Sequence, residues 1–267
     1  MIARKELITW IVCFAILNCY VNMTPRILDQ INLLHWMAYW AGFFILAFLT
    51  AKILKMRGIQ SFGLKRHKGY LTNLIIGLLL GMCIYVLKYF CFYGLGKFTV
   101  EGLMPVEYII PLLSKALIGM LFSSLINDIL IRGYWFRYFK ENKMIRGFVL
   151  ASTIIYVLDD SWNEGFHWIN LMFSVLLGVS LAYTVYKTGS IWMSIGIHWG
   201  GNLIYRTLYG FEGQGVYKLD HVKEGILYDY VSLGVTALLM PTIFLLLRRR
   251  NDNTSLSTKQ GKARLLV

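Results

Sequence analysis

Charged residues are scarce in this chain of 267 residues, and acidic ones are the scarcest. Only 15% of the residues are charged, with 14 Asp or Glu against 27 Lys or Arg. Hydrophobic residues make up 57%, and the mean hydropathy is +0.56. This balance excludes an ordinary soluble domain, and the length suits one compact helical bundle better than two domains.

Cysteine is also sparse, and an internal repeat is missing. Cys13, Cys19, Cys83 and Cys91 lie within apolar runs and show no CxxC spacing, so we interpret them as packing residues rather than disulfides or a zinc site. Many secondary transporters are built from inverted repeats. The lack of a repeat therefore argues against a small transporter or lipid-handling protein, which only the buried polar groups would favour.

Long apolar segments dominate what is present. Eight can be drawn, most of them near the 20 residues that span a bilayer, at 7–23, 33–54, 71–93, 108–131, 147–159, 168–186, 190–208 and 229–247. They predict an all-α fold, a multi-pass transmembrane bundle of about eight helices, in which the fifth is short. We expect a single bundle over residues 1–250 and a flexible polar cytoplasmic tail over 251–267.

Lys and Arg gather at the chain ends and in alternate loops, mainly at 4–5, 52–68, 137–146, 187 and 248–250. Because such loops stay in the cytoplasm, this pattern predicts that both termini are cytoplasmic, in a membrane we expect to be the bacterial plasma membrane. The net charge of +13 then reflects topology and attracts anionic lipid, so nucleic acid is not an expected partner. Residues 134–146 predict an amphipathic helix at the cytoplasmic interface.

Two polar residues interrupt the fourth segment. Asn127 and Asp128 directly follow an apolar run at 109–125, where a charge costs about 2.5–3.5 kcal/mol on insertion scales. Arg132 lies four residues later on the same helical face and can pair with Asp128. This pair either fixes helix packing or marks a functional site, since intramembrane ionisable residues are functional candidates.

A second polar pair lies in the seventh segment, where His198 and Asn202 are four residues apart. With a rise of about 1.5 Å per residue, Asp128 and His198 fall at roughly 13 and 12 Å from the cytoplasmic ends of their helices, and Asp160 nearer 20 Å. We therefore expect Asp128, His198 and Asn202 to share a polar pocket with Asp160 above it. The alternative is interhelical hydrogen bonding, with Gly196, Gly200 and Gly201 allowing close packing.

Three motifs on successive segments carry a resemblance. They are Asn127-Asp128-Ile129-Leu130-Ile131-Arg132-Gly133, Tyr156-Val157-Leu158-Asp159-Asp160 and His198-Trp199-Gly200-Gly201-Asn202. They are similar to E-E-x-x-x-R-G, F-x-x-x-H and H-x-x-x-N of the CPBP family, which comprises CAAX-type prenyl-protein endopeptidases and bacteriocin-processing or abortive-infection relatives. The resemblance covers about residues 108–206.

The departures from this family pattern fall on its chemistry. The resemblance implies that the first glutamate activates a water, that histidines assist it, and that a polar cluster holds the oxyanion. Asn127 stands at the first position and cannot act as a base, Asp128 is one methylene shorter than glutamate, and Asp160 replaces a histidine. Arg132, His198 and Asn202 match. Losing a general base removes about 10²–10⁴-fold in rate.

Two functions follow from this resemblance. One is an intramembrane endopeptidase that hydrolyses a peptide or membrane-protein substrate at a lipid-buried site, with Asp128 or Asp160 as base and His198 as partner. The other is a pseudoprotease that binds peptide, confers immunity to a bacteriocin or regulates a partner, so whether the chain is an enzyme stays open. The sequence requires no cofactor, although Asp128, Asp160 and His198 form a possible divalent metal site.

Overall fold

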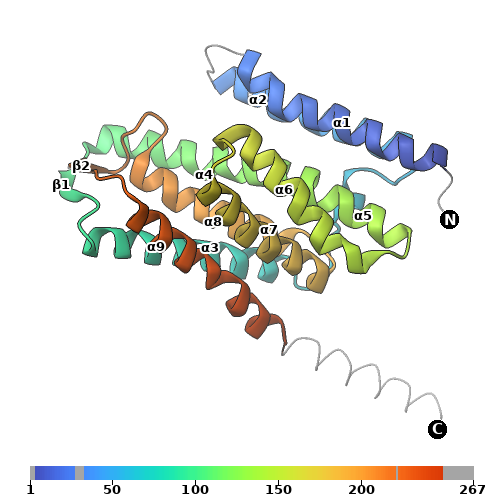
Figure 1. Cartoon of the computed structure of the whole chain (residues 1–267). Coiled ribbons are helices and arrows are strands. Elements are labelled where there is room, and N and C mark those ends of the chain that lie inside the picture. The colour runs from blue at the N-terminus through green and yellow to red at the C-terminus, as the bar shows by residue number, and fades with distance from the viewer. Residues whose placement is uncertain (1–3, 28–32, 221, 249–267) are drawn as a thin grey trace, which may run out of the picture.

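The computed structural model of the chain describes residues 4–27, 33–220 and 222–248 (Figure 1). The predicted tail at 251–267 lies outside these residues. Nearly all of the described chain is helical, which confirms the predicted all-α class. The helices are α1 (Arg4–Ile27), α2 (Leu33–Ile53), α3 (Tyr70–Gly94), α4 (Val106–Asp128), α5 (Tyr134–Glu141), α6 (Phe148–Glu164), α7 (Trp168–Thr188), α8 (Trp192–Tyr209) and α9 (Ile226–Ala237).

The helices pack as a multi-pass membrane bundle. Each of the eight predicted segments forms a helix, and six stretches of the described chain are long and apolar enough to cross a membrane, at 5–27, 34–53, 70–94, 106–141, 168–188 and 226–248. The two segments outside this set are α6 and α8. These helices carry the second and third motifs. Helix α6 is short, with 17 residues, whereas the polar residues of the third motif lower the mean hydropathy of α8.

The closest helix pair is α3 with α8, and glycines permit it. A side chain at Gly77 or Gly81 of α3 would strike the α8 backbone, and one at Gly196 or Gly200 of α8 would strike the α3 backbone near Leu78. Small residues allow such approach in membranes, where packing rather than hydrophobicity drives helix association. The interface fixes the position of α8 and therefore of His198.

The first motif lies within one long helical rod. Helix α4 continues through a π turn, Ile129–Gly133, directly into α5, so that residues 106–141 are helical throughout. The predicted interfacial helix at 134–146 is therefore partly wrong, because α5 ends at Glu141 and a separate 3₁₀ turn, Ile145–Gly147, follows. Tyr134 of α5 is fully buried and donates a hydrogen bond of 2.5 Å to the Trp10 carbonyl of α1, which ties the rod to the first helix.

A short antiparallel pair, β1 (Thr99–Leu103) and β2 (Tyr217–Asp220), was not predicted. Thr99 pairs with Asp220 and Leu103 with Tyr217, with an irregularity between Val100 and Gly102. The pair joins the α3–α4 connection to the α8–α9 connection, at the end of the bundle away from α5 (Figure 1). It therefore links the connection that precedes α4 to the connection that follows α8, the helices that carry the first and third motifs.

The glycine contacts predict a position-specific effect of one methyl group. Gly196→Ala should lower the free energy of unfolding in detergent by about 1–3 kcal/mol, because the added carbon meets the Leu74 and Leu78 backbone. Gly119→Ala in α4 is the control, since nothing lies within 4 Å of a carbon added there. Thermal unfolding measures both, and equal midpoints would contradict the packing role of Gly196.

Candidate functional site

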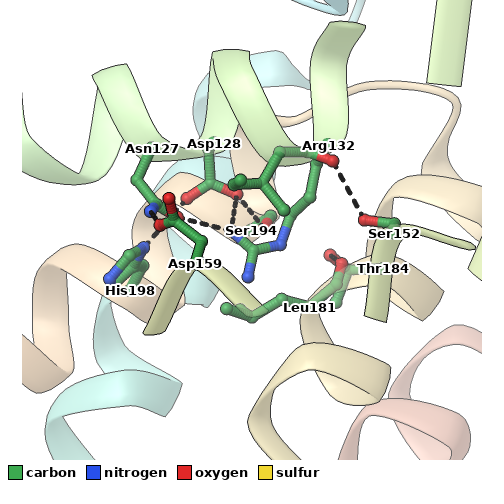
Figure 2. A network of polar contacts seen from close by, with 10 residues as sticks. Asn127, Asp128, Arg132, Ser152, Asp159, Leu181, Thr184, Ser194 and His198 are labelled. Atoms are coloured by element: carbon green, nitrogen blue, oxygen red, sulfur yellow. Dashed lines mark hydrogen bonds and ion pairs between the residues drawn. The ribbon is translucent and has the colours of Figure 1, made fainter. Parts of the chain in front are cut away.

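The centre of the site is Asp128, whose side chain is completely buried (Figure 2). Its Oδ1 lies 3.1 Å from Arg132 Nη1 and also accepts a hydrogen bond from the Ser194 hydroxyl. Its Oδ2 lies 3.2 Å from His198 Nδ1. Both carboxylate oxygens are therefore engaged, one by the helix that carries Asp128 and both by α8. A buried charge requires such pairing because it has lost its water.

The π turn places Arg132 beside Asp128. Turns of this type are rare and frequent at functional sites. Here the Ser152 hydroxyl of α6 donates to the Ile131 carbonyl at 3.1 Å, which anchors the turn to the next motif helix. Gly133 completes the turn where a side chain would strike the Phe62 backbone carbonyl. Steric crowding by Phe62 thus explains why the last residue of the first motif is glycine.

Asn127 links the ion pair to an acid on α6. Its Oδ1 accepts from Arg132 Nη1 at 3.1 Å, and its Nδ2 donates to Asp159 Oδ2 at 3.5 Å. Asp159 Oδ1 accepts from Asn22 Nδ2 of α1 at 2.9 Å. The residue of the second motif that faces the first motif is therefore Asp159, the neighbour of the predicted Asp160.

Asp160 and Asn202 lie outside this network. Asp160 accepts a hydrogen bond from the Ser174 hydroxyl of α7. Asn202 is partly buried, and its side chain makes no hydrogen bond to another residue of the described chain. The structure thus brings together Asn127, Asp128, Arg132 and His198 of the six predicted residues, and their catalytic roles stay predictions.

The sequence analysis missed three members of the network. Ser194 had a usable signal, because it lies four residues before His198 on the same helical face. Asp159 lies next to Asp160, and nothing in the sequence distinguishes which of the two turns inward. Asn22 comes from α1, outside the motif region, and no pattern points to it.

Arg132 keeps hydrogen-bonding capacity that the network does not use. Its guanidinium carbon lies 4.6 Å from the centre of the Tyr156 ring, a cation–π contact. Its Nε and Nη2 atoms are buried and donate to no residue of the described chain. Unsatisfied buried donors are costly and few in native proteins. These two donors therefore fit a carbonyl or carboxylate oxygen that the chain itself does not supply.

Two hollows adjoin the network. A cavity of about 10 Å³, the size of one water, is lined by His198, Tyr85 and Thr236 among apolar residues. A larger groove of about 410 Å³ lies between α1 and α6, with Asn18, Asn22 and Asp159 among its lining residues. The small cavity borders His198, and the groove borders Asp159.

A metal site has no geometric support. Among the residues that the structure describes, no group of three or more His, Cys, Asp or Glu side chains is placed to hold a metal ion. Asp128 and Asp160 bond to different serines on different helices. The metal set Asp128, Asp160 and His198 and the expectation of no required cofactor both stay predictions.

A family model described as type II CAAX prenyl endopeptidase Rce1-like matches residues 109–204. The resemblance to this family that the motifs predicted is thereby confirmed over these residues. The chain is an integral-membrane, CAAX-protease-like protein. The match contains all six predicted site residues but ends short of α9 and does not include α1, α2 or α3. No curated protein and no solved structure matches the chain.

The buried pair of this CAAX-protease-like protein predicts asymmetric mutational effects. Arg132→Met should cost about 3–5 kcal/mol of unfolding free energy, because it leaves Asp128 buried without its cation. Asp128→Asn combined with Arg132→Met should recover part of that loss, since no charge is then buried. Denaturant unfolding in micelles measures both variants, and a double variant less stable than the single one would oppose this account.

Proposed function

We propose that this protein is a membrane-embedded polypeptide-binding protein that keeps the scaffold of CAAX-type peptidases but does not hydrolyse peptide bonds. The observation that carries the proposal is the state of Asn127, which occupies the position of the family's catalytic glutamate. Its amide cannot take a proton from water, and it is held between Arg132 and Asp159. Asp128 cannot easily replace the base, because both of its oxygens are engaged.

The groove between α1 and α6 supports binding. It is lined by apolar residues such as Phe14 and Leu158 together with the polar Asn18, Asn22 and Asp159. An apolar groove with a few placed polar groups is the usual form of a ligand site. A membrane-spanning segment that carries one basic or amide side chain fits this lining. We therefore name such a segment, from a peptide or a membrane protein, as the ligand class.

The biological role follows from holding such a segment without cutting it. A binding protein of this kind would regulate a partner membrane protein or confer immunity to a membrane-active peptide such as a bacteriocin. We propose that it lies in the bacterial plasma membrane. We also propose that both chain ends are cytoplasmic, because Lys and Arg gather near the ends of the chain and in alternate loops.

A second candidate, a retained peptidase, rests on the pairing of His198 with Asp128. An Asp that bonds one ring nitrogen of a histidine orients the other nitrogen as a general base. His198 Nδ1 bonds Asp128 Oδ2, and the histidine also lines the water-sized cavity. In this mechanism His198 would deprotonate a water, Asp128 would stabilise the resulting imidazolium, and Arg132 donors would hold the oxyanion.

Restoring the family pattern predicts a gain of cleavage. Asn127→Glu with Asp159→Asn and Asp160→His supplies a carboxylate base and a histidine and removes the acid that would face the new glutamate. We expect wild-type protein in detergent to leave a mixed library of apolar peptides intact. The triple variant should cleave some of them, with a rate gain of about 10²-fold or more. Mass spectrometry of the library measures both.

The matched control replaces the new base by its amide. Asn127→Gln with Asp159→Asn and Asp160→His has the same shape and hydrogen-bonding reach but cannot take a proton, so it should not cleave. Cleavage by wild-type protein that His198→Ala abolishes would instead support the second candidate and refute the binding-only function.

The proposed groove predicts site-specific protection of a native thiol. Cys19 is exposed and lines the groove, whereas Cys83 of α3 is also exposed but lies outside it. An apolar peptide of about 20 residues with one central Lys should slow maleimide labelling of Cys19 and leave Cys83 unchanged. The same peptide with Leu in place of Lys should protect less, because it cannot pair with Asp159. Equal protection of both thiols would argue against the groove.

A further inference from the structure

A second cleft is lined in part by residues of α5. Helix α5 lies at the end of the bundle away from the strand pair (Figure 1). The cleft has a volume of about 540 Å³ and lies between the end of α2, the 3₁₀ turn η1 (Ile59–Phe62), α5 and the loop after α7. Its lining residues are Lys55, Met56, Arg57, Gln60, Ser61, Gly63, Lys65, Phe136, Arg137, Lys140 and Gly189. This cleft is separate from the Asp128 network and from the α1–α6 groove.

The cleft is strongly cationic. Five of its lining residues are Lys or Arg, and none is acidic. One of the five, Arg137, forms an ion pair with Glu141, but its Nε atom is buried and donates to no residue in the described part of the chain. Lys55 adopts a φ of 57°, a conformation uncommon for a residue with a side chain. The positive charge that converges here is thus largely uncompensated.

The position of the cleft is the boundary of the apolar bundle. Lys55 follows the last residue of α2 by two positions, and the basic loop continues from there. Buried Met56 and Phe136 supply apolar surface, while the basic side chains supply charge. A phospholipid presents the same sequence of groups, with an anionic phosphate next to the apolar start of its acyl chains.

We propose that this cleft binds the phosphate headgroup of an anionic phospholipid. Lys and Arg both bind phosphate, the guanidinium in a bidentate manner and the ammonium as a point charge. The proposal names a defined site, beyond the general attraction of a basic protein to an acidic membrane. It does not depend on whether the Asp128 site binds or cleaves peptides, so the two proposals can fail separately.

The test compares two charge-matched variants in lipid nanodiscs. The cleft variant carries Lys55→Gln, Arg57→Gln and Lys65→Gln. The control carries Lys52→Gln, Arg66→Gln and Lys68→Gln, which removes the same charges from the same segment outside the cleft. Native mass spectrometry of protein released from discs of phosphatidylglycerol and phosphatidylcholine counts retained lipid. We expect wild-type and control protein to retain phosphatidylglycerol. The cleft variant should retain at least about tenfold less of it.

Further arms separate the possible outcomes. Lys55→Arg with Arg57→Lys and Lys65→Arg should bind like the wild type, and unchanged thermal unfolding of the cleft variant would show that it folds. Equal losses in the cleft and control variants would overturn the proposal, because surface charge alone would then account for retention. Glycerol 1-phosphate that binds delipidated protein as tightly as phosphatidylglycerol would also overturn it, since the ligand would then be a soluble phosphate.

Discussion

The constraint on which the structure depends is the burial of a charge pair, Asp128 and Arg132, inside an apolar bundle. Neither side chain reaches solvent, so each must find partners within the chain. Arg132 is reached through a π turn on the same rod, whereas Ser194 and His198 come from α8. Helix α8 can deliver them only because glycines let it lie directly against α3. The close packing of α8 on α3 therefore positions the polar site. Helix packing and a shared polar site, the two alternatives for α8, occur together.

The residues that depart from the peptidase pattern fit one another. Asn127 both donates and accepts, which lets it join Arg132 to Asp159. A glutamate at that position would face the Asp159 carboxylate and add a second acid beside it, which raises the cost of ionising either one. The amide at position 127 and the acid at position 159 thus form a mutually compatible pair. This compatibility supports the proposed binding function, because random loss of single catalytic residues would not be expected to leave a matched pair.

Much of the fold and part of the site could be predicted from the sequence. The lengths of the apolar segments predicted the eight helices. The four-residue spacing of Asp128 and Arg132, and the similar depth of Asp128 and His198 in the membrane, predicted that these three side chains meet. The rotation of α6 decides whether Asp159 or Asp160 turns inward, and neither periodicity nor spacing fixes it. The contribution of Asn22 depends on how α1 docks, a long-range contact without a sequence signal. The exposed strands β1 and β2 are too short for alternation to reveal them.

Retained polar residues are weak support for catalysis in such a site. Removing one member of a buried charge pair is strongly destabilising, so Asp128 and Arg132 would persist for folding alone. Stability does not, however, explain buried donors that no residue pairs with, or a cavity beside a polar side chain. Arg132 Nε and Nη2 are buried donors without a partner in the described chain, and His198 borders a cavity the size of one water. A site maintained only for packing would be expected to satisfy or remove such groups. The two unpaired donors fit the proposal that an oxygen-bearing ligand binds beside Arg132.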